Sequence, residues 1–379
     1  MGEAADIVGG GTPDTTNPDY WDGVIDWYSP VEIGEQVHVN GSKKKITTLG
    51  LQKSSAKVLP IGTVLFTSRA GIGNTAILSK EGATNQGFQS IVPHNNELDT
   101  YFIYSRSYEL KRYGETNGAG STFVEVSGKQ MSQMPIFIPS LPEQTAIGNF
   151  FRTLDDAITL HKRKLDGLKE LKKGCLQQMF PHKGESVPRV RFDGFAGAWE
   201  VRKLGDIFVS VSDKNFSHLP VLSASQEKGM VLRSELGIDI KYDINSLNTY
   251  KRIQQGQFAI HLRSFQGGFA HSDLEGITSP AYTILDYKNS NEHDSNYWKE
   301  IFVSQLFIKR LETITYGIRD GRSISFSEFS TLKFSCPSKL EQTAIGSFFC
   351  KFDNIISSQQ SRLDKLKQLK SAYLQKMFV

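Results

Sequence analysis

Cysteine is scarce in this chain of 379 residues, which contains only Cys175, Cys336 and Cys350. Their number is odd and their spacing fits no metal-ligand pattern, so we expect reduced thiols, as in a cytoplasmic protein. No run of about 20 apolar residues is present, which argues against a membrane-spanning helix. The opening MGEAADIVGGG has no basic segment followed by an apolar one, so we expect no secretory signal.

The sequence also lacks the common catalytic motifs. We find no His-Glu-x-x-His, Cys-x-x-Cys, Gly-x-Ser-x-Gly or phosphate-loop pattern. Gly9-Gly10-Gly11-Thr12 lacks the spacing of a dinucleotide-binding loop and is interpreted as a turn. Asp155 and Asp156 are interpreted as the start of a helix, where negative charge is favourable. We therefore expect no catalytic residue and no metal ligand in this chain, and predict a binding protein.

Charge is nearly balanced, with 44 Lys and Arg residues against 40 Asp and Glu residues, a net charge of +4. This balance is compatible with a nucleic-acid partner but does not require one. A hydrophobic fraction of 39% excludes a disordered chain, and the length predicts two or three domains.

One long segment occurs twice. Residues 143–180 and 341–378 align at a constant offset of 198 without gaps, and 20 of the 38 aligned pairs are identical. The spacing is too long for a solenoid repeat. The sequence therefore predicts a domain, a helical segment, a second domain and a second helical segment.

Both copies of the segment have the periodicity of a coiled-coil-like helix. The predicted apolar face contains Leu154, Ile158, His161, Leu165, Leu168, Cys175 and Met179 in the first copy, and Phe352, Ile356, Gln359, Leu363, Leu366, Tyr373 and Met377 in the second. The rhythm breaks at Lys172 and Lys370. From Asp155 to Phe180 such a helix is about 39 Å long. We expect the two helices to pair with each other, although packing of each against its own domain is the alternative.

The regions 1–140 and 182–338 combine strand-like runs with short helical candidates at 100–112 and 296–311, so we predict an α+β fold. Runs at 62–66 and 257–260 are predicted strands. Residues 62–76 align weakly with 256–270, which places Arg69 opposite Arg263. The globular regions have diverged much more than the helices.

Two different domains at a fixed separation suit a long, regular ligand such as DNA, because one turn of duplex is about 34–36 Å. Basic residues and amides in predicted loops are the candidate DNA contacts. They are Lys43, Lys44, Lys45, Arg69, Asn85, Gln86, Lys111 and Arg112 in the first region, and Lys214, Lys251, Arg252, Arg263, Arg319 and Arg322 in the second. For each lysine the alternative is a solvated surface charge, and for Asn85 and Gln86 a structural turn.

The paired Glu-Gln-Thr-Ala-Ile-Gly…Phe-Phe…Leu-Gln…Met-Phe segments resemble the helical spacers of specificity subunits of type I restriction-modification systems. Further matching segments are 9–13, 17–21, 85–88 and 190–200. The resemblance covers essentially the whole chain. One departure is that residues 189–203 have no counterpart ahead of Met1.

The resemblance implies two target recognition domains, at 1–140 and 182–338, and two long antiparallel helices, at 141–181 and 339–379, in a pseudo-two-fold repeat. Each domain would recognise one half of a bipartite sequence in double-stranded DNA, and the helices would set the gap. Two methyltransferase (M) subunits and restriction (R) subunits would be partners in the bacterial or archaeal cytoplasm. S-adenosylmethionine, ATP and magnesium would belong to those partners and not to this chain.

Exposed helix faces are the expected docking surface for the methyltransferase subunits, and the candidate residues are Arg152, Lys162, Lys169 and Lys351. A solvated helix face is the alternative for each of them. A coiled-coil scaffold without specific DNA recognition is the alternative for the chain as a whole, and a single-chain nuclease or methyltransferase would need an active site that the sequence does not show.

Overall fold

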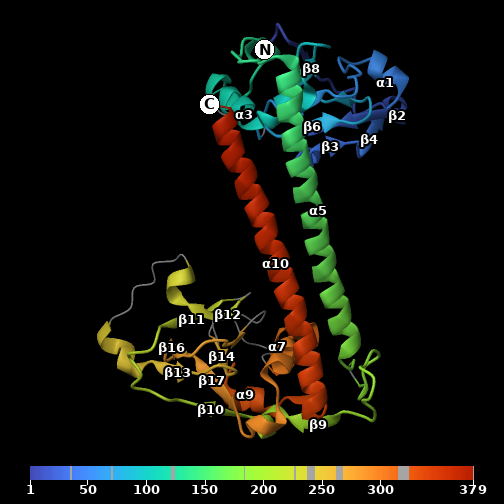
Figure 1. Ribbon diagram of the computed structural model, residues 1–379. Helices are drawn as coiled ribbons and strands as arrows, with labels where there is room; N and C mark the ends of the chain where they lie inside the picture. The colour runs from blue at the N-terminus through green and yellow to red at the C-terminus, as the bar shows by residue number, and fades with distance from the viewer. Residues whose placement is uncertain are drawn as a thin grey trace. The chain divides into compact units, whose positions relative to one another are not determined.

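The computed structural model describes residues 1–34, 36–69, 71–120, 124–182, 184–225, 228–236, 244–261, 268–314 and 324–378. The chain forms two compact units (Figure 1). Unit 1 comprises Met1–Arg163 and Ser361–Val379, and unit 2 comprises Lys164–Gln360. The division between the units falls inside both long helices, so each unit contains one end of each helix.

Unit 1 contains a five-stranded sheet of order β1-β8-β5-β6-β3 and a three-stranded sheet of order β4-β2-β7. The strands of unit 1 are β1 (Ala5–Gly9), β2 (Trp21–Tyr28), β3 (His38–Val39), β4 (Lys44–Ile46), β5 (Val64–Phe66), β6 (Thr75–Leu78), β7 (Ala83–Thr84) and β8 (Gln89–Pro93). Its short helices are η1 (Pro18–Tyr20), η2 (Pro30–Glu32), α1 (Thr48–Gln52), α2 (Thr100–Ser105), α3 (Ser107–Asn117) and α4 (Gly128–Ser132). All three residues of β5 are buried, as expected for a strand inside a sheet that is covered on both faces.

Unit 2 contains a four-stranded sheet of order β10-β17-β14-β15 and three two-stranded ladders, β11-β12, β13-β16 and β18-β9. The strands are β9 (Glu200–Lys203), β10 (Phe208–Val211), β11 (Leu222–Ser225), β12 (Gly229–Leu232), β13 (Lys251–Ile253), β14 (Phe258–Ile260), β15 (Phe269–His271), β16 (Gly276–Thr278), β17 (Thr283–Tyr287) and β18 (Lys333–Cys336). The short helices are α6 (Leu204–Ile207), η3 (Arg233–Leu236), η4 (Ile244–Thr249), η5 (Ser290–Glu292), α7 (Ser295–Val303), α8 (Gln305–Ile314) and α9 (Phe326–Thr331).

The two units share one framework, which confirms the weak alignment of 62–76 with 256–270. Val64 of β5 pairs with Ile77 of β6, and at the same offset Phe258 of β14 pairs with His271 of β15. The neighbouring strands correspond as well. In unit 1, β5 adjoins β8 and β8 adjoins β1; in unit 2, β14 adjoins β17 and β17 adjoins β10. Helices α2 and α3 cover the region predicted as helix at 100–112, and α7 and α8 cover the one at 296–311.

The duplicated segments form the two long helices, α5 (Leu141–Met179) and α10 (Lys339–Met377), each of 39 residues. The predicted length of about 39 Å was therefore too short, because it was counted from Asp155 and α5 begins at Leu141. In unit 1 the rings of Phe151 and Phe378 stack at 5.7 Å, and in unit 2 those of Phe180 and Phe349 stack at 6.1 Å. The beginning of each helix thus lies beside the end of the other within each unit, which is the predicted antiparallel pairing.

The ends of the long helices also pack into the cores of the units. The helices therefore both pair with each other and pack against the globular domains, which were the two predicted alternatives. The predicted apolar face is confirmed at Leu154, Leu165 and Leu363, which are buried. It is wrong at Met377, which is exposed, while Leu374 and Phe378 pack on the core. Tyr373 is partly exposed, but its ring lies 4.9 Å from that of Phe150 in α5, as the prediction requires. Asp155, predicted to open a helix, lies instead inside α5 and is buried.

Candidate nucleic-acid interface

Three parts of unit 1 that the sequence singled out lie together on the surface: the segments 9–13 and 85–88, and Arg69. The backbone N–H of Gly11 donates to the Thr84 carbonyl at 2.8 Å, and the hydroxyl of Thr12 donates to the side-chain oxygen of Gln86. The N–H of Ser68 donates to the Gly87 carbonyl at 2.8 Å. Arg69 and Gln86 therefore belong to one cluster of loops, although 17 positions separate them in the sequence.

This cluster of loops requires glycine at position 10, because the backbone of Thr84 and Asn85 passes very close to it. A Cβ atom at Gly10 would lie 2.0 Å from the Asn85 carbonyl oxygen, which only glycine avoids. The amide oxygen of Asn85 accepts a hydrogen bond from the Gly87 N–H at 2.8 Å, so this side chain forms the structural turn that was the alternative interpretation. The side chain of Gln86 is exposed. Of the two amides, Gln86 is thus better placed for contact with a base.

Arg69 follows Ser68, three residues beyond the end of strand β5. Its Nη1 atom is 3.9 Å from Oε2 of Glu125, and 37% of the Arg69 side chain is exposed. This is a weak surface ion pair, which a phosphate or a guanine edge can replace at low cost. Lys111 and Arg112 are exposed on α3, and the Lys111 side chain packs against Gly73, between β5 and β6.

The lysines at 43–45 have three different environments. Lys43 is exposed, and Nζ of Lys44 lies 5.4 Å from the centre of the Trp21 ring, a cation–π distance. Nζ of Lys45 lies 3.4 Å from Oδ1 of Asp26, a carboxylate that is only 1% exposed. Lys45 therefore neutralises a buried charge in unit 1, and a contact between Lys45 and DNA stays a prediction.

Asp26 has further partners. Lys80 lies 3.3 Å from its Oδ2 atom, and the Ser42 N–H donates to Oδ1 at 3.2 Å. Burial alone would favour the neutral acid, but the hydrogen bonds from Ser42, Lys80 and Lys45 outweigh it and lower the pKa of Asp26 below its ordinary value of 3.8. Asp26 is therefore a fixed anion that organises β2, β4 and the turn before β7.

The candidate residues of unit 2 meet around Asp213. Nη1 of Arg252 lies 3.5 Å from Oδ2 of Asp213, and its Nε donates to Oε1 of Glu275 at 2.8 Å. The guanidinium also covers the ring of Phe216, 4.6 Å from the ring centre. Arg252 is thus held by two carboxylates, and recognition of DNA by this guanidinium stays a prediction.

The side chain of Lys251, which precedes Arg252 in β13, has a different partner. Its Nζ donates to the Tyr282 carbonyl at 2.6 Å. Burial, together with nearby Lys214, lowers the pKa of Lys251, while Lys214 itself is exposed. A surface pocket of about 340 Å³ adjoins Arg252 and is lined by the polar side chains of Gln254, Gln257 and Asp286. Arg263, Arg319 and Arg322 lie outside the described residues.

The candidate partner-binding residues lie on the long helices. Arg152, Lys162, Lys169 and Lys351 are all exposed. The guanidinium of Arg152 lies over the ring of Tyr101, 5.0 Å from its centre. Docking of methyltransferase subunits on these residues stays a prediction.

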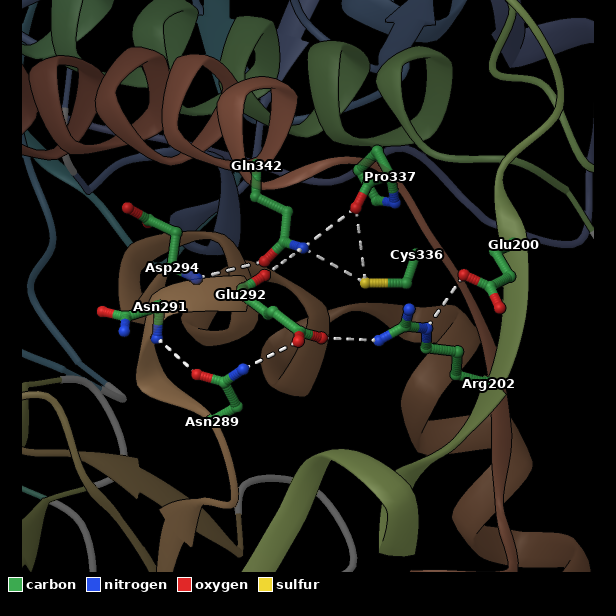
Figure 2. Close-up of polar contacts among 9 residues, drawn as sticks. All are labelled: Glu200, Arg202, Asn289, Asn291, Glu292, Asp294, Cys336, Pro337 and Gln342. Atoms are coloured by element: carbon green, nitrogen blue, oxygen red, sulfur yellow. Dashed lines mark hydrogen bonds and ion pairs between the residues drawn. The ribbon is translucent and has the colours of Figure 1, made fainter.

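The most regular polar site was not predicted, although the repeated Glu-Gln-Thr-Ala-Ile-Gly motif marks it in the sequence. Gln342 is 1% exposed; its Nε2 donates to the carbonyls of Glu292 and Pro337 at 3.2 and 3.0 Å, and its Oε1 accepts from the N–H of Asp294 at 3.1 Å (Figure 2). Asp294 is the N-terminal cap of α7. The side chain thus fastens the start of α10 to the loop before α7.

Gln144 makes the same contacts in unit 1. Its Nε2 donates to the carbonyls of Glu97 and Pro139 at 2.9 and 3.0 Å, and its Oε1 accepts from the N–H of Asp99, which caps α2. The motif is repeated because the same joint between helix and domain is built twice. Its function is to position the two globular regions on the helices.

Among the described residues, no three His, Cys, Asp or Glu side chains are grouped so that they can hold a metal ion. In the same part of the chain, no helix has the length and apolar character needed to cross a membrane.

Residues 1–170 match the family described as Type I restriction modification DNA specificity domain. The predicted resemblance of the chain to specificity subunits of type I restriction enzymes is confirmed.

One relative is the type I restriction enzyme MjaIX specificity subunit of Methanocaldococcus jannaschii, which is 31% identical over 222 residues, or 56% of this chain and 51% of the relative. The chain thus spans about half the length of this curated relative.

The α+β fold is shared with two solved structures. The S subunit of a type I restriction-modification system from M. genitalium has a TM-score of 0.63 and 15% identity, covering 100% of this chain and 94% of that one. A chain from a structural study of complex assembly and conformational transition of the type I R-M system has a TM-score of 0.53 and 17% identity, covering 100% and 96%.

Proposed function

We propose that this chain is the DNA sequence-specificity subunit of a type I restriction-modification complex, and that each unit recognises one half of a bipartite target in double-stranded DNA. The observation that carries the proposal is one strand and helix framework that occurs twice with different surfaces. Unit 1 adds the sheet β4-β2-β7 with Trp21 and Lys44, whereas unit 2 adds the ladders β11-β12 and β13-β16. Because the two units share a framework but differ in surface, they suit the recognition of two different half-sites of a DNA target.

In this proposal the chain supplies recognition and no catalysis. Two methyltransferase subunits dock on the exposed helix faces around Arg152, Lys162, Lys169 and Lys351, and restriction subunits complete the complex in the cytoplasm. S-adenosylmethionine, ATP and magnesium act in those partners. The repeat supports this stoichiometry, because two copies of one helical segment offer equivalent surfaces to two identical subunits.

Two clusters are the proposed DNA contacts. In unit 1 they are Arg69, Gln86 and the neighbouring Lys43, Lys44, Lys111 and Arg112, and in unit 2 Lys214, Lys251 and Arg252. Phosphate contacts of the lysines would position the duplex, and Arg69 and Gln86 have the hydrogen-bonding groups that distinguish base pairs in the major groove.

The test is to express the chain with its methyltransferase partner and to sequence the methylated bases of the host genome. We expect two short conserved sequences separated by a constant gap. Exchange of residues 1–140 for those of another specificity subunit should change one half-sequence and leave the other intact. Changes in both halves would contradict independent recognition, and methylation or cleavage by the purified chain alone would show that it is an enzyme.

A further inference from the structure

One valine of unit 1 is almost fully exposed at the surface. The side chain of Val31 is 88% exposed, although it lies in the short helix η2 between the buried residues Tyr28 and Ile33. A single exposed apolar side chain is ordinary on a protein surface and by itself indicates nothing. The position of Val31 gains its meaning from the turn that holds it and from the loops that this turn contacts.

The turn is fixed by its own hydrogen bonds. The N–H and the hydroxyl of Ser29 both donate to Oε1 of Glu32, at 3.0 and 2.9 Å. The N–H of Glu32 donates in return to the Ser29 carbonyl at 3.0 Å, and Pro30 restricts the backbone at the start of η2. The turn therefore presents Val31 in one position, so that contact with a ligand costs little further ordering of the chain.

Pro30 joins this turn to the loop that contains Gln86. A Cβ atom at Gly87 would lie 2.8 Å from Cγ of Pro30, so the proline ring packs against the backbone of that loop. The N–H of Asn85 donates to the Tyr28 carbonyl at 3.0 Å, just ahead of the turn. The exposed valine therefore directly follows a residue that touches the loop of Gln86.

Two further loops with candidate DNA contacts meet the same turn. Nδ2 of Asn74, at the end of the loop that follows β5 and contains Arg69, donates to the Ile33 carbonyl at 3.3 Å. The N–H of Lys43 donates to Oε2 of Glu32 at 2.7 Å. The turn is thus in contact with all three loops.

The surroundings of Val31 indicate the kind of ligand that it meets. Arg69 and Gln86 offer hydrogen-bonding groups, and Lys43 is an exposed cation. An apolar side chain on such a surface fits a polyanion that carries an isolated apolar group. In the major groove of DNA that group is the 5-methyl group of thymine. An apolar protein partner would need a larger patch, whereas Ile33, the next apolar residue after Val31, is buried.

We propose that Val31 contacts the 5-methyl group of a thymine in the half-site that unit 1 recognises, and so selects thymine at one position. This inference rests on the proposed function of the chain in the recognition of double-stranded DNA. Arg69 and Gln86 hydrogen-bond to neighbouring base edges, and Val31 adds the apolar contact.

The experiment compares thymine with uracil, because deoxyuridine pairs as thymidine does and lacks only the methyl group. Methylation sequencing identifies the target, and exchange of residues 1–140 shows which half unit 1 recognises. Gel retardation then measures binding of the complex with methyltransferase subunits to duplexes in which each thymine of that half is replaced in turn by deoxyuridine. We expect one replacement to weaken binding about fourfold, the effect of one methyl group removed from an apolar contact.

Val31→Ala should weaken binding to the unmodified target by a similar factor. It should bind the thymine and the deoxyuridine duplex equally at that position, because the contact is already lost. Val31→Ile keeps a branched apolar side chain and should retain the preference for thymine. Ile61→Ala is the matched control, because Ile61 is an exposed apolar residue that precedes β5, whereas Arg69 follows it. It should keep the preference for thymine unchanged.

An unchanged preference for thymine in Val31→Ala would overturn this inference, and so would a half-site without thymine or equal binding of every deoxyuridine duplex by the unaltered complex. In each of these cases the proposed function stands, because the unaltered complex still binds its target selectively. If Val31→Ala keeps the preference but assembles less well with the methyltransferase subunits in size-exclusion chromatography, Val31 contacts a protein and not DNA. Absence of any sequence-selective binding by the unaltered complex would refute the proposed function itself, and this inference with it.

Discussion

Nζ of Lys172 in α5 lies 2.7 Å from Oδ1 of Asp353 in α10. The repeat places the same pair in unit 1, where Nζ of Lys370 lies 2.5 Å from Oδ1 of Asp155. In each unit an ion pair therefore joins the end of one long helix to the beginning of the other. These pairs explain why the apolar rhythm breaks at the two lysines, which face the neighbouring helix while Leu171 and Leu369 face solvent.

The Lys172 pair is the better test of helix pairing, because Lys172 also lies 3.0 Å from Oε2 of Glu300, which is 2% exposed. Lys172→Met should lower the free energy of unfolding by about 3 kcal/mol, since it leaves a buried carboxylate without its cation. Urea unfolding monitored by circular dichroism measures the effect. Lys169→Met, an exposed neighbour on α5, should change stability by less than about 0.5 kcal/mol.

The loss in Lys172→Met should depend on pH. Burial raises the pKa of Glu300 above its ordinary value of 4.5 even with Lys172 present, and removal of the cation raises it further. A carboxyl group with a raised pKa in the folded state destabilises the fold once the pH exceeds its unfolded value. The deficit of the variant should therefore be larger at about pH 8 than at about pH 4. An equal deficit at both would show that lost packing, and not charge, is the cause.

The joint formed by Gln342 gives a second stability prediction. Gln342→Glu keeps the shape of the side chain but places a carboxylate against the carbonyls of Glu292 and Pro337. We expect a loss of about 3 kcal/mol, because a buried charge faces two acceptors and no donor replaces the amide N–H. Gln144→Glu should cause a comparable loss in unit 1. Gln368→Glu on the exposed face of α10 is the control and should be nearly neutral.

The architecture could be predicted from the sequence because its strongest signals are local or repeated. The duplicated segment predicted both long helices, and the weak alignment of 62–76 with 256–270 indicated that the two globular regions are related. The joints made by Gln144 and Gln342 were not predicted. Their motif was visible, but its partners lie about 45 to 50 positions away in loops that no periodic pattern places.

Individual roles of charged residues were the least predictable part of the site. Lys45 and Arg252 were selected as exposed loop cations, yet the structure places them against Asp26 and Glu275. Asp155 was assigned to a helix start, whereas Tyr101 and Lys370 hold it inside α5. Ion pairs between distant segments depend on the tertiary fold, and a single sequence carries no signal of them.

Asp26 should make the stability of unit 1 sensitive to acid. Its pKa is lowered in the folded state, so the stability it contributes is present above its unfolded pKa of 3.8 and is lost as the pH falls through the lower folded value. Asp26→Asn should therefore be less stable than the unaltered chain at about pH 7, and the difference should shrink below about pH 3. Asp22→Asn changes an exposed aspartate of the same strand and serves as the control. A constant difference at all pH values would exclude this titration.

Arg69 tests the proposed DNA contacts of unit 1. If its guanidinium binds a guanine through two hydrogen bonds, Arg69→Ala should weaken target binding by about 1–3 kcal/mol and leave binding to random duplex nearly unchanged. Gel retardation of the complex with methyltransferase subunits on both duplexes measures this difference. A phosphate contact would instead weaken both equally and reduce the salt dependence of binding. Lys53→Ala, an exposed lysine of unit 1, is the control.

The proposed spacer role of the helices predicts that the gap in the DNA target follows helix length. Seven residues inserted into both helices, between Arg163 and Lys164 and between Gln360 and Ser361, lie at the division between the units and leave both Lys–Asp pairs inside them. Seven residues are nearly two turns and add about 10.5 Å, close to three base pairs. We expect both half-sequences to be retained and the gap to widen by about three base pairs in methylation sequencing. Insertion into α5 alone should abolish methylation, because the helices then differ in length. A gap that stays the same after the double insertion would contradict the spacer role.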